Sequence, residues 1–424
     1  MTKPRLLFVS PRYLLPADMG GKIRTAHVLK GLKGGRFHVT LVSPGPREIP
    51  PAHGAELELL CDEFQSWPEP QRGPLFQIAR LGLITSRLPI PVATDRSPAA
   101  RRLVAGALKR ADLVVADFLH AAVLMPPALA APSVLFTHNV EAEIFARHAE
   151  IASGALQRMV WRDQLAKMQR FERDTLRAFD SIVAVSERDR EVFRREYGVD
   201  ASTIPTGVDL DYFPYHPVSE AAPPVIAFTA SMDSLANIDG VRWFMDTVWP
   251  RIAAAVPQAE MRVIGRNPDP ALVNEAKRRG LRWSFTGYVD DVRPHLEGAA
   301  VYVIPLRVGG GTRIKAYEAM AFGLPTVSTR LGVEGLAVEP GKHFIEADSD
   351  DAFATAVLAL LADGALRRAL AEVARALVER NFSARSVGAV FEGTCVATME
   401  TRAARGAAPN ASLARTRAPG RSGA

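Results

Sequence analysis

The segment VYVIPLRVGGGTRIKAYEAMAFGLPTV (301–327) holds one strand, one loop, one helix and the start of a second strand. Its first residues form a short apolar run, which is typical of a strand buried on both faces of a sheet. Three consecutive glycines then lead into a helical pattern near 313–322, and a β-branched run, TVSTR (326–330), follows. Strands that are joined through a helix run parallel, so the segment predicts a parallel βαβ unit.

The same alternation of short apolar runs and helical stretches extends along the chain. Comparable runs lie at 5–10, 38–43, 56–61, 112–117, 133–138, 181–186, 201–206, 225–230, 261–266, 283–288 and 343–348. Such a series predicts the α/β class with doubly wound parallel sheets. Residues 207–224 interrupt it with four prolines and no period, which predicts a linker between two domains.

The linker sets the expected domain boundaries at 1–215 and 216–400. A last helix is expected at 384–399, and residues 401–424 carry five arginines and no acid among small residues, which predicts a disordered basic tail. In open α/β sheets, ligands bind beyond the carboxyl ends of the strands. Two such domains facing each other would therefore place a ligand in the cleft between them.

Composition excludes several classes of protein. The formal net charge of +6 divides into +4 for residues 1–215, −3 for 216–400 and +5 for the tail, so no basic groove for nucleic acid is indicated. Two cysteines, Cys61 and Cys395, cannot form a disulfide framework. No apolar run approaches the length of a signal-peptide core or of a membrane span. We therefore expect a cytoplasmic protein without a targeting segment.

The glycine-rich loop before residue 313 predicts a phosphate site. Gly309, Gly310, Gly311 and Thr312 follow a buried strand and open a helix, so their N–H groups and the helix dipole would face an anion. Arg313 and Lys315 lie where cations oppose that dipole, and an anionic ligand explains them. Glu318 follows at a distance suited to ribose hydroxyls. The alternative is a tight turn with surface cations and an ion pair along the helix.

Two further features lie in the first domain. Gly20 and Gly21 precede a helical pattern, which suits close approach to an anion, although they also suit a plain turn. No GxGxxG motif is present, which argues against NAD or FAD. His138 ends the run at 133–138 and is placed to hydrogen-bond a substrate, unless it is structural.

Paired carboxylates and one long helix each allow a second interpretation. Asp209 with Asp211 and Asp348 with Asp350 have Mg²⁺-like spacing, but they lie in the linker and before a helix, so we interpret both as structural and expect no metal. The helix near 155–179 mixes aromatic and basic residues. It is suited either to packing against a core or to an anionic membrane surface.

Taken together, these motifs resemble the GT-B glycosyltransferases of family 4, the retaining nucleotide-sugar transferases, over about residues 5–400. The resemblance rests on the Gly20-Gly21 loop, on His138 and on four longer segments. Those segments are TGVD (206–209), FTASMDSLANIDGVRWF (228–244), GYVDDVRPHL (287–296) and GGGTRIKAYEAMAFGLPTVST (309–329). The most similar branch is that of bacterial sugar transferases associated with exopolysaccharide clusters. The implied fold has two facing Rossmann-like domains, an N-terminal acceptor-side and a C-terminal donor domain. The last helix would pack back on the first.

The resemblance also implies roles for single residues. Glu318 matches the second glutamate of an E-x7-E motif that binds the donor ribose, and Gly20 and Gly21 match a loop that meets donor phosphates and acceptor. His138 matches a position near the transferred sugar. The sequence departs from the family at Gly310, where the first glutamate would fall. It departs again at Ser231 and Asn237, where an arginine and a lysine would hold the diphosphate. Arg313 and Lys315 are candidates to replace those two cations.

The implied function is hexosyl transfer, of EC class 2.4, from a nucleotide-diphosphate sugar to an acceptor hydroxyl with retention, in polysaccharide or glycoconjugate synthesis. Catalysis is assigned to His138, Arg313 and Lys315, and no metal or other cofactor is expected. The acceptor would be a saccharide or a lipid-linked saccharide, with peripheral contact at the inner membrane left open. Two alternatives remain: a non-catalytic partner subunit that binds a nucleotide sugar, and a sugar-nucleotide epimerase. A dehydrogenase is disfavoured because a dinucleotide motif is missing.

Overall fold

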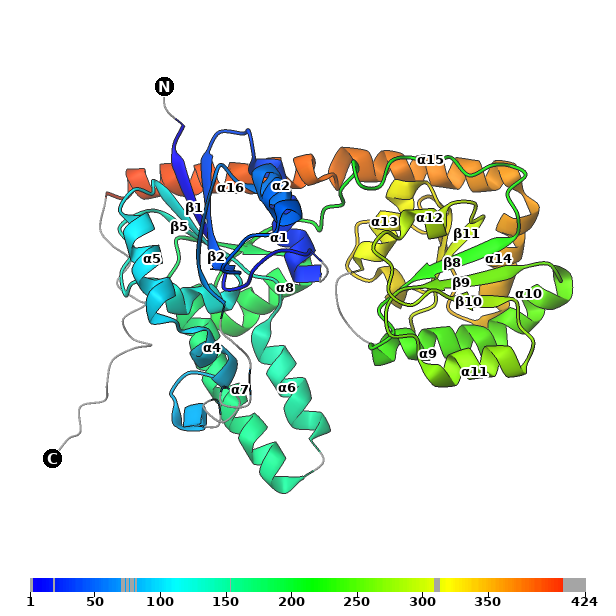
Figure 1. Ribbon diagram of the computed structural model, residues 1–424, viewed down its shortest axis with the longest axis horizontal. Coiled ribbons are helices and arrows are strands. Elements are labelled where there is room, and N and C mark those ends of the chain that lie inside the picture. The colour runs from blue at the N-terminus through cyan, green and yellow to red at the C-terminus, as the bar shows by residue number, and fades with distance from the viewer. Residues whose placement is uncertain are drawn as a thin grey trace. The chain divides into compact units, whose positions relative to one another are not determined.

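The computed structural model describes residues 3–17, 20–69, 73, 76, 80, 82–152, 154–308 and 313–406. The chain divides into two compact units (Figure 1). The first unit comprises Met1–Pro205 with Val387–Ala424, and the second comprises Thr206–Ser386. Each unit contains one parallel sheet, as the βαβ series predicted.

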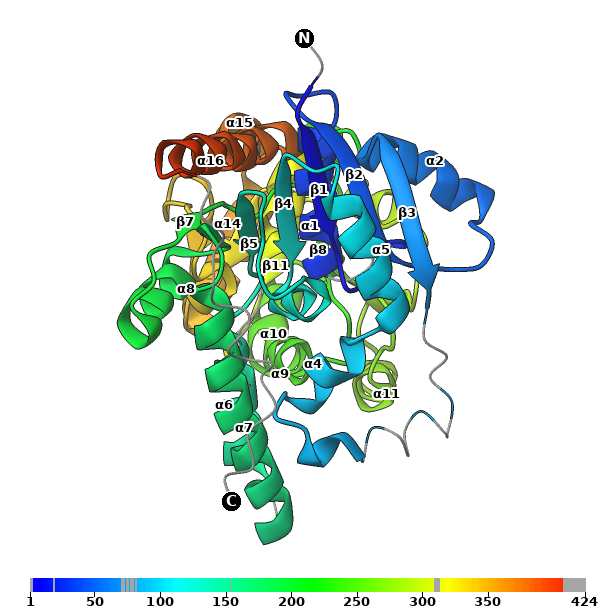
Figure 2. The ribbon, with the colours of Figure 1, turned by 90° about the vertical axis from the view of Figure 1, so that its left-hand side faces the viewer.

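The first unit is built on a seven-stranded sheet with the order β3-β2-β1-β4-β5-β6-β7. The strands are β1 (Arg5–Val9), β2 (His38–Gly45), β3 (Glu63–Pro68), β4 (Leu113–Asp117), β5 (Ser133–Phe136), β6 (Ser181–Ala184) and β7 (Ser202–Thr203). Leu7 and Val9 of β1 pack on one side with α5 (Pro98–Leu108), which lies across the strands in Figure 2. Leu6 and Phe8 pack on the other side with α1 (Gly20–Leu32). The apolar run is therefore buried on both faces, because helices cover both faces of the sheet.

The expected strand at 56–61 is instead the end of a helix, α2 (Pro51–Leu60). Proline at the first helical position pre-sets the backbone for a helix. Leu57 and Leu60 lie three residues apart and are the two buried side chains of this helix, so the apolar spacing is helical. The strand at this edge of the sheet, β3, begins only at Glu63.

The first unit also contains a helical hairpin and two shorter helices. The helices α6 (Glu141–Ile151) and α7 (Ala155–Leu176) pack against each other as a hairpin that extends beyond the sheet in both views (Figures 1 and 2). The shorter helices are α4 (Ile90–Asp95) and α8 (Glu187–Val192). Ser97 caps α5 and Ser186 caps α8 through side-chain oxygens that accept backbone N–H bonds, as N-cap serines do.

The second unit has a six-stranded sheet with the order β10-β9-β8-β11-β12-β13. Its strands are β8 (Val225–Thr229), β9 (Glu260–Ile264), β10 (Trp283–Phe285), β11 (Val301–Ile304), β12 (Thr326–Ser328) and β13 (Ile345–Glu346). Its helices are α9 (Leu235–Trp243), α10 (Trp249–Ala255), α11 (Pro270–Arg278), α12 (Arg293–Leu296), α13 (Ile314–Phe322), α14 (Asp350–Ala362) and α15 (Gly364–Asn381). The strand β8 pairs with β9 and with β11. The loops that follow these three strands therefore lie side by side at the carboxyl edge.

The units divide at Pro205 and Thr206, whereas the sequence analysis placed the boundary at 215 and 216. The last helix, α16 (Ala384–Ala404), belongs to the first unit from Val387 onward. Phe391 of this helix packs edge-on against Phe136 of β5, with ring centroids 5.2 Å apart. Residues 401–404, expected in the disordered tail, continue α16, because Arg402 is buried and pairs with Asp180 at 2.6 Å. The rest of that expected tail, from residue 407, lies outside the described residues.

The contact between α16 and α1 leaves no room for a side chain. A Cβ on Gly388 would lie 2.4 Å from the Cα of Gly31. We expect Gly388→Val to lower the free energy of unfolding by about 1–3 kcal/mol, the range for overpacking. Gly393, on the same helix with nothing within 4 Å of its Cβ position, is the matched control. Gly393→Ala should raise stability by up to about 1 kcal/mol through helix propensity. Urea unfolding of both variants measures the difference, and equal stability would contradict the packing.

Candidate functional site

The strongest candidate site lies at the start of α13 in the second unit. Arg313 directly precedes this helix and its side chain is 5% exposed, so it is not a surface cation. Burial lowers the pKa of Arg313, with Glu334 opposing that shift. Gly309, Gly310, Gly311 and Thr312, predicted to form the phosphate loop, lie outside the described residues.

Lys315 points from α13 toward β8 and the first turn of α9. Its Nζ donates a hydrogen bond of 3.2 Å to Oδ1 of Asn237. The ammonium also lies 4.3 Å from the centroid of the Phe228 ring, in the range of a cation–π contact. Burial lowers the pKa of Lys315 to about 7. Within the part of the chain that the structure describes, no carboxylate comes within 4 Å of this ammonium, so it lacks a counter-ion.

Glu318 lies one helical turn after Lys315 and is half-buried. No described residue donates a hydrogen bond to its carboxylate. Burial raises the pKa of Glu318 to about 7, and the charge of Lys315 opposes that shift. A buried carboxylate without a donor is costly, and such a group is typical of a site that awaits a ligand. The sequence placed Glu318 on the ligand side of the helix, and its contact with a ribose stays a prediction.

The second group of predicted residues lies in the first unit around His138. Nε2 of His138 lies 2.8 Å from Oδ1 of Asp117, and Nη1 of Arg24 lies 3.3 Å from Nδ1. Since the guanidinium can only donate, Nδ1 accepts and the proton is assigned to Nε2. Burial lowers the pKa of His138, although Asp117 opposes that shift. Both ring nitrogens are therefore used inside the unit, and a substrate contact of His138 stays a prediction.

An aromatic ring that stacks on His138 explains why position 21 is a glycine. The ring of Phe118 lies 3.9 Å from that of His138, centroid to centroid. A Cβ on Gly21 would lie 2.8 Å from the same phenyl ring. Phe118 itself adopts φ 62°, a strained backbone for a bulky residue, and such strain concentrates at functional sites. Gly20 begins α1 beside it, and the proposed phosphate contact of both glycines stays a prediction.

Some residues were not found from the sequence: Arg24, Asp117 and Phe118 surround His138, and Arg266 donates a hydrogen bond of 2.9 Å to Oγ of Ser231. Asp117 ends the run at 112–117 and Phe118 follows it, so the only available signal was a carboxylate at the end of a strand. Arg266 ends the run at 261–266 and was taken as part of a strand, although β9 ends at Ile264.

Neither pair of carboxylates forms a metal site in the described part of the chain. No group of three or more His, Cys, Asp or Glu side chains suited to a metal is found among the described residues. Asp209 accepts backbone N–H bonds from Asp211 and Tyr212. Asp348 accepts a backbone bond from Arg330 at 2.8 Å. These bonds give Asp209 and Asp348 a role in holding loops, and the expectation that no metal is needed stays a prediction.

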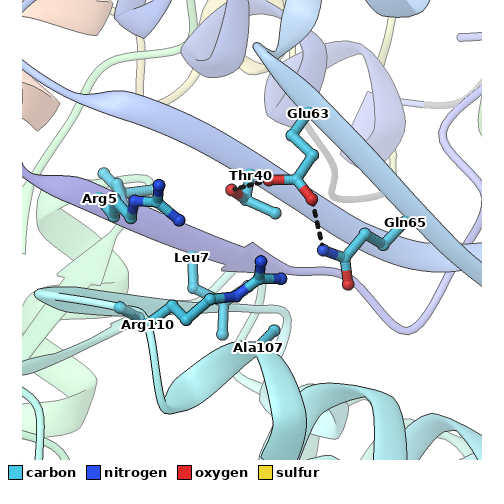
Figure 3. Close-up of a pocket in the computed structure, with 9 residues that line it drawn as sticks. Arg5, Leu7, Thr40, Glu63, Gln65, Ala107 and Arg110 are labelled. Atoms are coloured by element: carbon cyan, nitrogen blue, oxygen red, sulfur yellow. Dashed lines mark hydrogen bonds between the residues drawn. The ribbon is translucent and has the colours of Figure 1, made fainter.

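A small pocket at the amino end of β1 is not a candidate for the site. Figure 3 shows it between Arg5, Thr40, Glu63, Gln65 and Arg110. Its internal space is about 10 Å³, which suits a single water molecule. It also lies at the edge of the sheet opposite to the one where ligands bind in parallel α/β folds.

Comparison with known proteins identifies the family. Residues 20–212 match the family described as Glycosyltransferase Family 4, and residues 223–363 match Glycosyl transferases group 1. The chain belongs to the family 4 glycosyltransferases. Solved structures show the fold: sucrose-phosphate synthase from Thermosynechococcus elongatus has a TM-score of 0.65 at 17% identity, covering 94% of this chain and 100% of that one. Anabaena HepE in complex with UDP and glucose has a TM-score of 0.63 at 16% identity, covering 93% and 100%. The fold is therefore GT-B.

Relatives of similar sequence match part or most of this chain. The phosphatidyl-myo-inositol mannosyltransferase of Mycobacterium tuberculosis is 27% identical over 209 residues, 47% of this chain and 54% of the relative. The chain thus spans about half the length of the mannosyltransferases that it matches. A Klebsiella pneumoniae protein described as an uncharacterized 44.6 kDa protein in cps region is 18% identical over 90% of this chain and 97% of its own length. Of the helices that the structure describes, none is both long and apolar enough to cross a membrane.

The raised pKa of Glu318 has a consequence for stability. Because the pKa is about 7 in the folded chain against an ordinary value of 4.5, the folded state binds the proton more tightly, and the charged carboxylate destabilises the fold as pH rises from about 4.5 past 7. Glu318→Gln should therefore stabilise the protein at pH 8 and change its stability little at pH 5. Thermal unfolding at several pH values measures this. A stability change that does not vary with pH would show that the carboxylate is well solvated.

Proposed function

We propose that this chain transfers a sugar from a nucleotide-diphosphate sugar to an acceptor hydroxyl. The observation that carries the proposal is the pair of partly desolvated ionic groups on α13, the Lys315 ammonium and the Glu318 carboxylate, at the carboxyl edge of the second sheet; neither has an ion pair within 4 Å among the described residues. A diphosphate needs a cation and a ribose needs an acceptor, so one nucleotide would satisfy both groups. The structures of Anabaena HepE in complex with UDP and with UDP-glucose support a nucleotide donor.

The chemistry assigned to these groups is stabilisation of the leaving nucleotide. Negative charge grows on the diphosphate as the bond to the sugar breaks, and fixed cations lower the energy of that transition state. Lys315 and Arg313 supply cations, while Glu318 orients the nucleotide through its ribose. We infer hexosyl transfer with retained anomeric configuration, as the family resemblance implies. No step of this scheme needs a metal.

The acceptor that we propose is a saccharide or lipid-linked saccharide of bacterial polysaccharide synthesis. The Klebsiella relative of nearly equal length, described as lying in the cps region, supports that setting. Near the tip of the α6–α7 hairpin, Leu156 is 71% and Met159 is 62% exposed. Arg158 and Arg162 follow on the same helix. Apolar side chains flanked by cations suit peripheral contact with an anionic membrane, so we place the acceptor at that surface.

Product analysis tests the function directly. The purified chain is incubated with radiolabelled UDP-glucose or another nucleotide-diphosphate sugar and with an extract of lipid-linked saccharides. We expect the label to appear in the acceptor and the nucleoside diphosphate to be released. NMR of the product should show that the transferred sugar keeps the anomeric configuration that it had in the donor. An interconverted nucleotide sugar without transfer would indicate the epimerase. Binding without any turnover would indicate a non-catalytic partner subunit.

The same assay in EDTA tests the expectation that no metal is required. We expect the rate to persist, since neither pair of carboxylates is arranged for a metal. Full loss with EDTA, restored by Mg²⁺ or Mn²⁺, would contradict it.

The ribose contact of Glu318 can be tested by a double-mutant cycle in which one change is made in the protein and the other in the ligand. Glu318→Gln keeps the size of the side chain but removes its charge and one acceptor. Binding of the nucleoside diphosphate should weaken by about 1–3 kcal/mol, the range for a hydrogen bond to a charged group. The 2′,3′-dideoxy nucleotide lacks the hydroxyls, so the same substitution should cost it almost nothing. Equal losses for both ligands, measured by calorimetry, would remove Glu318 from the ribose site.

A further inference from the structure

Two cations reach the loop between β8 and α9 from opposite sides. This loop, Ala230–Ser234, carries no cation of its own. Because β8 lies between β9 and β11 in the sheet, the segment after β9 flanks the loop on one side and the start of α13 flanks it on the other. Arg266 comes from the first of these segments and Lys315 from the second.

The backbone holds Arg266 against the loop. A Cβ on the preceding residue, Gly265, would lie 2.0 Å from the carbonyl oxygen of Ala230, and this glycine has φ +141°. Met232 donates its backbone N–H to the carbonyl of Arg266 at 3.0 Å. The two segments are therefore in direct contact, and the position of the Arg266 side chain follows from that contact.

The guanidinium of Arg266 lies over the start of the loop. Its Nε donates a hydrogen bond of 2.9 Å to Oγ of Ser231. The carboxylate of Asp233 lies 3.5 Å away, and both side chains of this pair are 40% or more exposed. Such an exposed, single contact contributes little to stability, so the guanidinium can exchange this partner for the oxygens of a ligand.

Lys315 meets the same loop through Asn237. The amide of Asn237 accepts from Lys315 at 3.2 Å and donates to the carbonyl oxygen of Ser231 at 2.7 Å. One short chain of hydrogen bonds therefore runs from one cation through Asn237 and Ser231 to the other. The one charged side chain of the loop, Asp233, is exposed and forms its ion pair with Arg266, and two cations fixed on either side of such a loop suit a ligand with two adjacent negative groups.

We propose that Arg266 and Lys315 bind the diphosphate of the nucleotide together, one from each side of the β8–α9 loop. The inference rests on the proposed function and adds Arg266 to its site. It also accounts for the uncharged side chains at Ser231 and Asn237: each is hydrogen-bonded to a cation from another segment. The charge that the sequence lacks at these two positions is thus present beside them in space.

A third cation at this edge provides the matched control. Arg307 forms two hydrogen bonds, of 2.9 and 3.2 Å, to the carboxylate of Asp239 and lies over the ring of Trp243. Its charge is already neutralised by a bidentate partner. Arg307→Gln therefore removes a nearby positive charge without touching the proposed site.

Calorimetry with UDP, GDP and the matching nucleosides tests the inference on the full chain. For the diphosphate that binds the wild type, Arg266→Gln and Lys315→Met should each weaken binding about tenfold or more, in the range for charge-assisted bonds. Affinity for the matching nucleoside should change less than about twofold, and Arg307→Gln should leave both ligands within about twofold. Circular dichroism and urea unfolding confirm that each variant folds.

A relocated cation gives a second readout. The double variant Ser231→Arg with Arg266→Ser moves the charge across the existing hydrogen bond, and it should recover much of the affinity that Arg266→Ser alone loses. If the wild type binds a diphosphate and Arg266→Gln binds it equally well, the inference is overturned while the proposed function stands. If the wild type binds neither diphosphate nor any nucleotide sugar, both are overturned. Equal losses for diphosphate and nucleoside would show a structural role and would also overturn the inference.

Discussion

Backbone contacts at the carboxyl edge of the second sheet determine which segments meet around the β8–α9 loop. At Gly265 a Cβ would lie 2.0 Å from the carbonyl oxygen of Ala230, and at Gly240 it would lie 2.4 Å from the carbonyl oxygen of Pro305. Atoms this close cannot accommodate a side chain, so both positions require glycine. The first contact presses the segment after β9 against the loop after β8. The second brings α9 against the segment after β11.

The electrostatics of the site follow from this packing. Lys315 and Glu318 are drawn out of solvent on one short helix, and burial moves the pKa of each to about 7, from opposite directions. Partial desolvation costs free energy that no internal ion pair within 4 Å offsets in the described structure. Proteins retain such groups where function requires them. Arg307, on the same edge, is fully paired with Asp239 and carries no such cost.

The sequence predicted the two parallel sheets well, because strands buried on both faces appear as short apolar runs whatever their neighbours. It failed at 56–61, where leucines spaced for a helix also read as an apolar run. It pointed to Glu318 and Lys315 because both lie beside a glycine-rich loop, a local signal, and their roles stay predictions. It did not single out Arg266, since the contact with Ser231 joins residues 35 positions apart. It registered Ser231 and Asn237 as lost cations, because the cations that approach them come from the segment after β9 and from α13, and only the fold brings them together.

Each unit has a glycine in close contact with another segment, but the polar groups beside the two glycines differ in whether they have partners. In the first unit Gly21 admits the ring of Phe118, which covers His138, and Asp117 and Arg24 occupy both ring nitrogens. The polar atoms of that histidine are satisfied without a ligand, and the strained backbone of Phe118 is the remaining sign of function there. In the second unit Gly265 brings Arg266 to the β8–α9 loop, while on α13 the carboxylate of Glu318 and the ammonium of Lys315 have no ion pair within 4 Å among the described residues. The second unit therefore retains partly desolvated charges without ion pairs, whereas the first unit holds a cluster in which both ring nitrogens of the histidine already have partners.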